Sequence, residues 1–332
     1  MPFLVSALLG FIPMLFFAAF VNWLDRYEKE PKILLGGAFV WGAVVAAGAA
    51  FIVNTTLGIG IFYVTGSEGV TEFTTGSLIA PVTEELLKGL AVLLVFLFFR
   101  REFDSVLDGI IYAAITALGF AATENTYYIY EMGYHQGGWG GLAYLAFIRI
   151  VVVGWQHPFY TAFFGIGLAM ARLNRSPFIR ILAPIVGLGI AMLTHSIHNT
   201  LSPLLIGIGG LGGMALGSLI DWFNWSLMFI FIVYLIVREQ RLLAAHLRDE
   251  VPARVMSARQ YQAAVKVYRR GPIVFQALFN GKLFPTLRFY QLCGELAHKK
   301  EQYRRLGNEQ SNQAIINRLR NEIYRLSPTT PA

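Results

Sequence analysis

Charged residues are scarce in this sequence. Asp, Glu, Lys and Arg make up 14% of the 332 residues, whereas 55% of the residues are hydrophobic and the mean hydropathy is +0.54. A soluble domain usually carries about 25% charged residues, so this composition argues against one. The chain is predicted to be an integral membrane protein.

Cysteine is almost absent as well. Cys293 has no second cysteine with which to form a disulfide bond or a metal knuckle. The sequence also lacks the HExxH pattern, in which two histidines on one helix bind zinc. We therefore expect no thiol redox chemistry and no zinc site of that type.

Long apolar runs are abundant. A helix that crosses a bilayer core of about 30 Å needs about 20 mainly apolar residues. Seven segments qualify as predicted spans: 3–24, 33–54, 77–99, 106–131, 142–171, 178–206 and 216–237. The first is expected to be a span and not a cleaved signal peptide, because no positive region precedes it. The expected fold is all-α, a polytopic bundle of about seven transmembrane helices.

The basic residues of the connections predict the orientation. Lys and Arg follow the first, third, fifth and seventh segments, whereas connections 65–76, 132–141 and 207–215 contain none. Cytoplasmic connections carry the excess of basic residues in membrane proteins. The N-terminus is therefore predicted to lie outside and the C-terminus in the cytoplasm.

Residues 238–332 differ from the rest in charge. They contain 17 basic and 7 acidic residues, a net charge of +10, which leaves −3 for residues 1–237 of the total of +7. Each basic residue near an anionic lipid surface contributes about 1 kcal/mol of attraction. We predict a transmembrane domain at 1–237 and a basic, mostly helical cytoplasmic tail at 238–332 that contacts anionic headgroups and not nucleic acid.

Ten ionisable residues nevertheless fall within the predicted spans. A charge at mid-membrane costs about 2.5–3.5 kcal/mol on insertion scales, so these side chains are expected to face one another or a wet cavity. They are Glu84, Glu85, Lys88, Asp108, Glu124, Arg149, His157, His195, His198 and Asp221. Asp108 and Asp221 lie close to span ends, where contact with solvent explains them. Arg149 is expected to pair with a carboxylate or a headgroup.

Four short motifs give most of these residues a common spacing. In "TEELLK", Glu84 and Lys88 are four residues apart and share a helix face, whereas Glu85 is turned by about 100°. The same spacing relates Phe120 to Glu124 in "GFAATEN", His157 to Thr161 in "QHPFYT" and His195 to Asn199 in "THSIHN". The four polar stripes can meet at one site in the outer half of the bilayer.

Such a site has the groups needed for peptide hydrolysis. A carboxylate can take a proton from water, and His or Asn can bind a metal ion or stabilise an oxyanion. Single members also have structural explanations: an ion pair of Glu84 with Lys88, a helix bridge by Glu124 with Asn125, and a bond from His157 to a carbonyl freed by the next proline. Packing explains the four motifs together far less well.

The motifs "WLDRYEKEP", "EELLK", "FAATEN", "HPFYT" and "HSIHN" occur in this order between about residues 20 and 205. In this order and at these transmembrane positions they resemble the PrsW family of intramembrane proteases. That family belongs to a wider group with the CAAX prenyl endopeptidases and bacteriocin-processing relatives. The resemblance implies a protease in a bacterial inner membrane.

The resemblance also implies roles for residues of this chain. Glu84 and Glu85 match the pair that activates water, and Lys88 ends that motif. The other predicted site residues are Glu124, Asn125, His157, His195 and Asn199. His198 departs from the pattern, because its position is usually aromatic.

Two hydrolytic mechanisms fit these residues. In the favoured one, Glu124, His157 and His195 hold a zinc ion with a fourth position open to water, and Glu84 or Glu85 is the base. In the other, no metal takes part, and His and Asn side chains donate to the oxyanion.

By resemblance, the expected substrate is a transmembrane protein, for example a membrane-anchored anti-sigma factor whose first cut starts an envelope stress response. Two other functions stay open. One is a CAAX-type peptidase, and the other is a transporter or receptor that uses the buried charges as a proton relay. Charges spread along the membrane depth would favour the relay, and charges clustered at one level would favour the enzyme.

Overall fold

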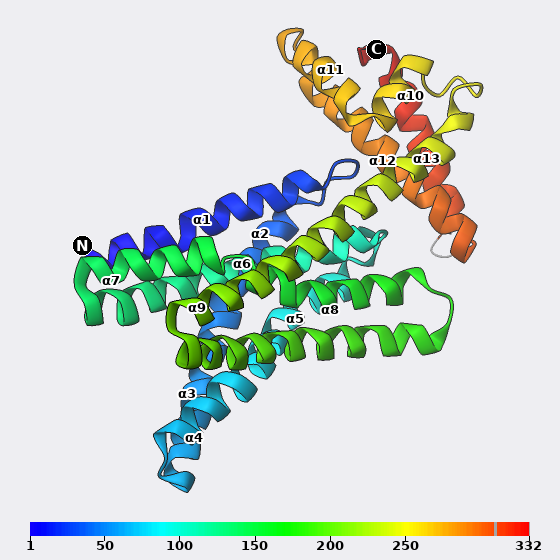
Figure 1. The fold of residues 1–332 in the computed structure, drawn as a ribbon. Coiled ribbons are helices and arrows are strands. Elements are labelled where there is room, and N and C mark those ends of the chain that lie inside the picture. The colour runs from blue at the N-terminus through cyan, green and yellow to red at the C-terminus, as the bar shows by residue number, and fades with distance from the viewer. Residues whose placement is uncertain (309–310, 332) are drawn as a thin grey trace. The chain divides into compact units, whose positions relative to one another are not determined.

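The computed structural model describes residues 1–308 and 311–331, and every regular element in these ranges is helical. The α-helices are α1 (Pro2–Leu24), α2 (Lys32–Val40), α3 (Ala47–Thr65), α4 (Glu68–Phe73), α5 (Ala80–Phe98), α6 (Val106–Tyr127), α7 (His135–Phe147), α8 (Gln156–Leu173), α9 (Pro177–Leu247), α10 (Ala258–Val265), α11 (Val267–Phe279), α12 (Leu283–Leu306) and α13 (Asn312–Leu326) (Figure 1). Short π-helical turns join several of them, at Trp41–Ala46, Thr74–Ile79, Tyr128–Tyr134 and Ile148–Val152. The prediction of an all-α protein is confirmed.

Four helical stretches of the described residues are long and apolar enough to cross a membrane. They are Pro2–Leu24, Lys32–Thr65, Val106–Leu173 and Pro177–Glu250. The last two exceed one bilayer thickness and contain breaks at Gly138 (φ 58°) and Gly210 (φ 54°), backbone conformations that favour glycine. The chain is thus shown to have four candidate spans, whereas the count of seven stays a prediction.

The predicted span 142–171 is not one continuous helix. The backbone leaves the helical conformation at residues 153–155, between the turn Ile148–Val152 and α8. Pro158 is the third residue of α8, in the first turn, where a helix does not need the missing N–H. The proline therefore starts a helix at a position where the hydropathy pattern predicted the middle of one.

The chain divides into two compact units. Unit 1 comprises residues 1–22, 31–172 and 176–230, and unit 2 comprises residues 23–30, 173–175 and 231–332. Helix α9 passes from one unit to the other between residues 230 and 231. All four motif helices contribute their motif residues to unit 1.

Helix α6 forms the centre of unit 1, and its side chains are buried along nearly its whole length. Glycines bring its neighbours close. A Cβ atom at Gly109 would lie 2.2 Å from the carbonyl oxygen of Gly165 in α8, and one at Gly119 would lie 2.0 Å from that of Phe39 in α2. Because small residues allow such close backbone contacts between membrane helices, α8 and α2 pack directly on α6, and α5 packs on it as well.

The chain reverses direction at Gly210, so that the residues of α9 before and after it run next to each other (Figure 1). A Cβ atom at Gly213 would lie 1.8 Å from the carbonyl oxygen of Leu205, and His198 forms an ion pair with Asp221 at 3.2 Å. The "THSIHN" motif is therefore covered on one side by the second half of its own helix.

Unit 2 has a separate hydrophobic core. Its fully buried residues include Leu247, Phe289, Cys293, Leu296 and Ile323, from α9, α12 and α13. Burial raises the pKa of the Cys293 thiol, so little of the reactive thiolate form exists at neutral pH. This cysteine is a packing residue of the core.

Candidate active site

The four motif helices of unit 1 place the predicted site residues around one small region. These residues are Glu84, Glu85 and Lys88 from α5, Glu124 and Asn125 from α6, His157 from α8, and His195 and Asn199 from α9. Side-chain contacts connect α5 to α8 and α9, and α6 to α8. The polar stripes, whose spacing allowed a common site, meet in the structure.

Glu85 is the carboxylate with the most partners. Its Oε1 atom lies 2.5 Å from Lys88 Nζ and 3.0 Å from His195 Nδ1, and its Oε2 atom accepts a hydrogen bond from Thr161 Oγ1 at 2.8 Å. Glu85, Lys88 and Thr161 have no exposed surface. Buried charges need such partners, and this network satisfies both oxygens of Glu85.

Lys88 therefore pairs mainly with Glu85 and not with Glu84, the partner that shared-face spacing suggested. Its Nζ atom lies 4.0 Å from Glu84 and 3.1 Å from Nδ1 of His157. Residues three apart on a helix are also neighbours. The long Lys88 side chain points toward Glu85, which Thr161 and His195 also contact.

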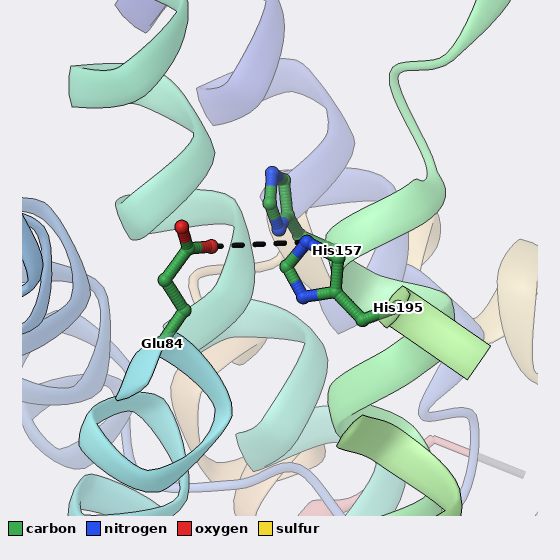
Figure 2. Close-up of side chains that lie close together, drawn as sticks. All are labelled: Glu84, His157 and His195. Carbon is green, nitrogen blue, oxygen red and sulfur yellow. Dashed lines mark ion pairs between the residues drawn. The ribbon is translucent and has the colours of Figure 1, made fainter. Parts of the chain in front are cut away.

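Glu84, which precedes Glu85 in the chain, has fewer hydrogen-bond partners than Glu85. It is 6% exposed, and its Oε2 atom has no hydrogen-bond partner among the described residues. Figure 2 shows its carboxylate facing the rings of His157 and His195, with His195 Nε2 at 3.9 Å. An unpartnered buried carboxylate oxygen is costly, which marks Glu84 as the acid that is free to act on a ligand.

Glu124 is held from two sides. Its Oε2 atom lies 2.8 Å from His157 Nε2 and also accepts a hydrogen bond from Arg149. The Arg149 guanidinium further donates through Nε to Asn125 Oδ1 at 2.7 Å. Arg149 is thus a carboxylate partner, one of the two roles expected for it, and it fixes both predicted site residues of α6.

A large cavity of about 1040 Å³ leads to these acids. Glu84 and Glu124 line it together with apolar and small residues of α3 and α6, among them Gly48, Ala50 and Phe120. A second cavity of about 90 Å³ is lined by His157, His195 and Asn199, and Glu124 lines this cavity as well as the first. The polar cluster therefore borders two cavities.

Two predicted details need correction. Asp108 and Asp221 were expected to be solvated, but they are only 7% and 8% exposed. Asp108 accepts hydrogen bonds from the backbone N–H and the hydroxyl of Ser105, in a capping box at the start of α6, and Asp221 pairs with His198. Both are satisfied by local partners.

The two histidines of "THSIHN" have different surroundings. His195 faces Glu84 and Glu85, whereas His198 lies 3.2 Å from Asp221 and 2.9 Å from the side chain of Gln156. Asn199 donates to the carbonyl oxygen of Gly76 at 2.9 Å and so ties α9 to the turn before α5. Among these three residues, only His195 contacts the glutamate pair.

Comparison with known families identifies this arrangement. The family model described as "PrsW family intramembrane metalloprotease" matches residues 30–237. The chain belongs to the PrsW family. The matched range contains every motif residue of the site, and the recognition based on motif order is confirmed.

Three curated relatives carry the name Protease PrsW. The one from Clostridioides difficile (strain 630) is 36% identical over 125 residues, 37% of this chain and 50% of the relative. The one from Geobacillus kaustophilus (strain HTA426) is 31% identical over 132 residues, 39% of this chain and 53% of the relative. The one from Bacillus subtilis (strain 168) is 27% identical over 167 residues, 50% of this chain and 68% of the relative. The chain thus spans about half the length of the first two relatives, and no solved structure matches it.

Three residues of the site suit the metal ion that the family description implies. One ligand atom each of Glu84, His157 and His195 lies within 4.8 Å of the others. Tetrahedral ligands at about 2.0–2.2 Å from zinc lie about 3.4 Å apart, so small side-chain movements suffice. The unpartnered Glu84 Oε2 atom and the Nε2 atom of His195, turned toward it, are ligand atoms of suitable chemistry.

This group differs in one member from the predicted ligand set of Glu124, His157 and His195, because Glu84 takes the place of Glu124. The charge of Glu124 is already matched by Arg149. Around metal sites, a carboxylate commonly accepts a hydrogen bond from a histidine that binds the metal. Glu124 contacts His157 in this way, and Glu85 contacts His195.

Sequence reasoning did not include Thr161 and Arg149 among the site residues. Thr161 shares a helix face with His157, which was the available signal, but its bond to Glu85 depends on how α5 and α8 pack. Arg149 had the signal of an unpaired charge within a span. Neither partner can be read from spacing within one helix.

Proposed function

We propose that this chain is an intramembrane endopeptidase that hydrolyses peptide bonds of membrane-anchored proteins. The observation that carries the proposal is the free Oε2 atom of Glu84, beside His157 and His195, at the edge of a large cavity. The family assignment supports the same reaction class. Clustering of the acids and histidines in one region, and not along the membrane depth, favours an enzyme over a proton relay.

The three glutamates of the site have different roles in the proposed hydrolysis. In this proposal Glu84, which lines the cavity, accepts a proton from water there through the carboxylate oxygen that does not face His195. Glu85 and Glu124 orient the rings of His195 and His157 through Nδ1 and Nε2 respectively. A metal ion held by His157, His195 and one oxygen of Glu84 would polarise the scissile carbonyl and acidify water, and the other oxygen of Glu84 would remain available to accept the proton.

The cavity supports a membrane-anchored substrate. Apolar side chains such as Phe51, Ile59 and Phe62 line it along α3, and it reaches the acids at Glu84 and Glu124. An apolar segment that moves from the bilayer into this cavity stays in apolar surroundings. A polar peptide that enters the cavity loses its hydrogen bonds to water. We propose a single-pass membrane protein as the substrate, with an anti-sigma factor as one such protein.

A bulky residue in the cavity is expected to weaken substrate binding. Gly48 lines the cavity, and a Cβ atom there meets nothing within 4 Å, so Gly48→Phe should fold while its ring fills part of the cavity. We expect KM for a membrane-anchored substrate to rise at least about 10-fold with kcat little changed, the signature of lost uniform binding. The measurement is the cleavage rate against substrate concentration in reconstituted vesicles.

Gly37→Phe is the matched control, because Gly37 is also helical and open but lies outside the cavity. It should leave KM at the wild-type value. Equal effects of both substitutions would show that the cavity does not bind the substrate, and no cleavage by folded wild-type protein would refute the proposed function.

We also propose the finer topology: seven spans, an external N-terminus, a transmembrane protease domain at 1–237 and a cytoplasmic tail at 238–332, in a bacterial inner membrane. The breaks at Gly138 and Gly210, in connections without Lys or Arg, support external turns at these positions.

Reporter fusions test this topology. Fusions after Gly138 and Gly212 should report an external location, and fusions after Arg101 and Arg175 a cytoplasmic one, because the basic connections stay inside. A cytoplasmic signal from either glycine position would contradict the seven-span arrangement.

A further inference from the structure

Unit 2 carries a helical hairpin with an apolar outer surface. Helix α11 (Val267–Phe279) is joined to α12 (Leu283–Leu306) by a tight turn with Gly281 at φ 65°. Six large apolar side chains of this hairpin are exposed, Tyr268 at the start of α11 and five near the turn: Phe275, Leu278, Phe279, Phe284 and Leu287. We call these six residues the apolar tip. A contiguous exposed apolar surface of this kind marks an interaction site.

The spacing places most of the apolar tip on one side of the hairpin. Tyr268, Phe275 and Phe279 are seven and four residues apart and share a face of α11, and the rings of Phe275 and Phe279 are 4.9 Å apart. Phe279 is 74% exposed and Phe284, just beyond the turn, is 82% exposed. The surface therefore continues from one helix to the next.

The hairpin itself is firmly folded. Ala277 of α11 and Phe289 of α12 have no exposed surface, and α11 packs along α12. The apolar tip is thus a fixed surface of a packed unit and not a frayed end.

The charge around the apolar tip has one sign. Residues 251–294 contain no Asp or Glu and seven basic residues: Arg254, Arg259, Lys266, Arg269, Arg270, Lys282 and Arg288. Exposed Arg269 and Lys282 lie within or beside the apolar tip. Aromatic residues interleaved with Lys and Arg are typical of segments that lie in the interface of an anionic bilayer.

Connectivity brings a bilayer within reach of unit 2. Its first segment, residues 23–30, begins at the end of the candidate span Pro2–Leu24, and its longest segment, residues 231–332, begins within the candidate span Pro177–Glu250. No long linker separates unit 2 from either span. We propose that the apolar tip inserts into the lipid interface and that the surrounding basic residues bind anionic headgroups. The proposal does not depend on proteolysis.

A depth measurement on the full chain tests this proposal. A spin label at Asn280→Cys, on the turn, is compared with one at Asn321→Cys, an exposed site on α13; the native Cys293 is buried. In vesicles that contain anionic lipid, the ratio of oxygen to aqueous-nickel accessibility at position 280 should exceed that at 321 at least about threefold, because oxygen concentrates in the apolar phase.

A double variant and a control variant refine the test. Phe279→Ser with Phe284→Ser should return the label at 280 to the accessibility seen at 321, whereas Tyr324→Ser, at an exposed aromatic residue of α13, should change nothing. Vesicles of neutral lipid should lower the ratio at 280.

Three outcomes would overturn the proposal. Equal accessibility at positions 280 and 321 would place the apolar tip in water. Protection of position 280 from both oxygen and nickel, with spin–spin broadening, would show that a second copy of the chain covers the apolar tip. Equal insertion in neutral and anionic vesicles would remove the role of the basic residues.

Discussion

Glu84→Gln is expected to reduce cleavage of a membrane-anchored substrate by at least about 10²-fold per folded molecule, the lower range for losing a general base. The amide keeps the shape of the carboxylate but cannot accept a proton. Folding should persist, because the Oε2 atom of Glu84 accepts no hydrogen bond, its ion pairs with Lys88 and His195 are long, at 4.0 and 3.9 Å, and Lys88 retains its closer ion pair with Glu85. The measurement is the initial cleavage rate in reconstituted vesicles, made alongside a melting curve.

Glu85→Gln is the informative contrast. It removes the carboxylate that lies 2.5 Å from Lys88, a lysine with no exposed surface. Stranding a buried charge costs about 3–5 kcal/mol, so this variant should lose thermal stability as well as activity. Glu85→Gln combined with Lys88→Met should regain stability without regaining cleavage. Wild-type turnover in well-folded Glu84→Gln would refute the role of Glu84 and return the acids to a structural role.

Metal binding is expected to depend on His157 and His195. The purified wild-type chain should bind one equivalent of zinc, and His157→Gln should weaken that binding at least about 100-fold, because an amide is a far poorer zinc ligand than imidazole. A chelator should abolish cleavage by the wild-type chain, and added zinc should restore it. The direct measurement is the metal content of the protein after equilibration against buffered zinc.

His198→Gln is the matched control for the metal. His198 is another imidazole of the same helix as His195, but it contacts Asp221 and Gln156 and is not part of the group that can hold an ion. This variant should keep its zinc. Loss of zinc from His198→Gln, or full zinc content in His157→Gln, would show that the ligands have been assigned wrongly.

The sequence allowed the fold class and the family to be predicted because both depend on strong local signals. Long apolar runs predicted helices, and the order of short polar motifs predicted the PrsW family. Spacing within each helix placed Glu84, Glu124, His157 and His195 on polar stripes that could meet, and the structure places these four residues in one region. Helix breaks were harder to predict, since hydropathy does not distinguish Pro158 at the start of a helix from a proline in its middle.

The pairing of side chains could not be predicted in the same way. Lys88 shares a helix face with Glu84, yet it lies closer to Glu85, because Thr161 and His195 from two other helices also gather at Glu85. Glu124, which was predicted to bind the metal, accepts a hydrogen bond from Arg149 of the turn Ile148–Val152. Such choices depend on contacts between helices, and one sequence carries no record of those contacts.

The central claim is that the site around Glu84, His157 and His195 hydrolyses peptide bonds of membrane-anchored proteins. Mass spectrometry of a reconstituted cleavage reaction in H₂¹⁸O tests it most directly, with the wild-type chain and Glu84→Gln side by side. The account predicts that only the wild-type chain yields a new carboxyl terminus, within or at the edge of the apolar segment of the substrate, and that this carboxylate contains ¹⁸O from water. An intact substrate with folded wild-type protein, or the same labelled product in equal yield from Glu84→Gln, would contradict it.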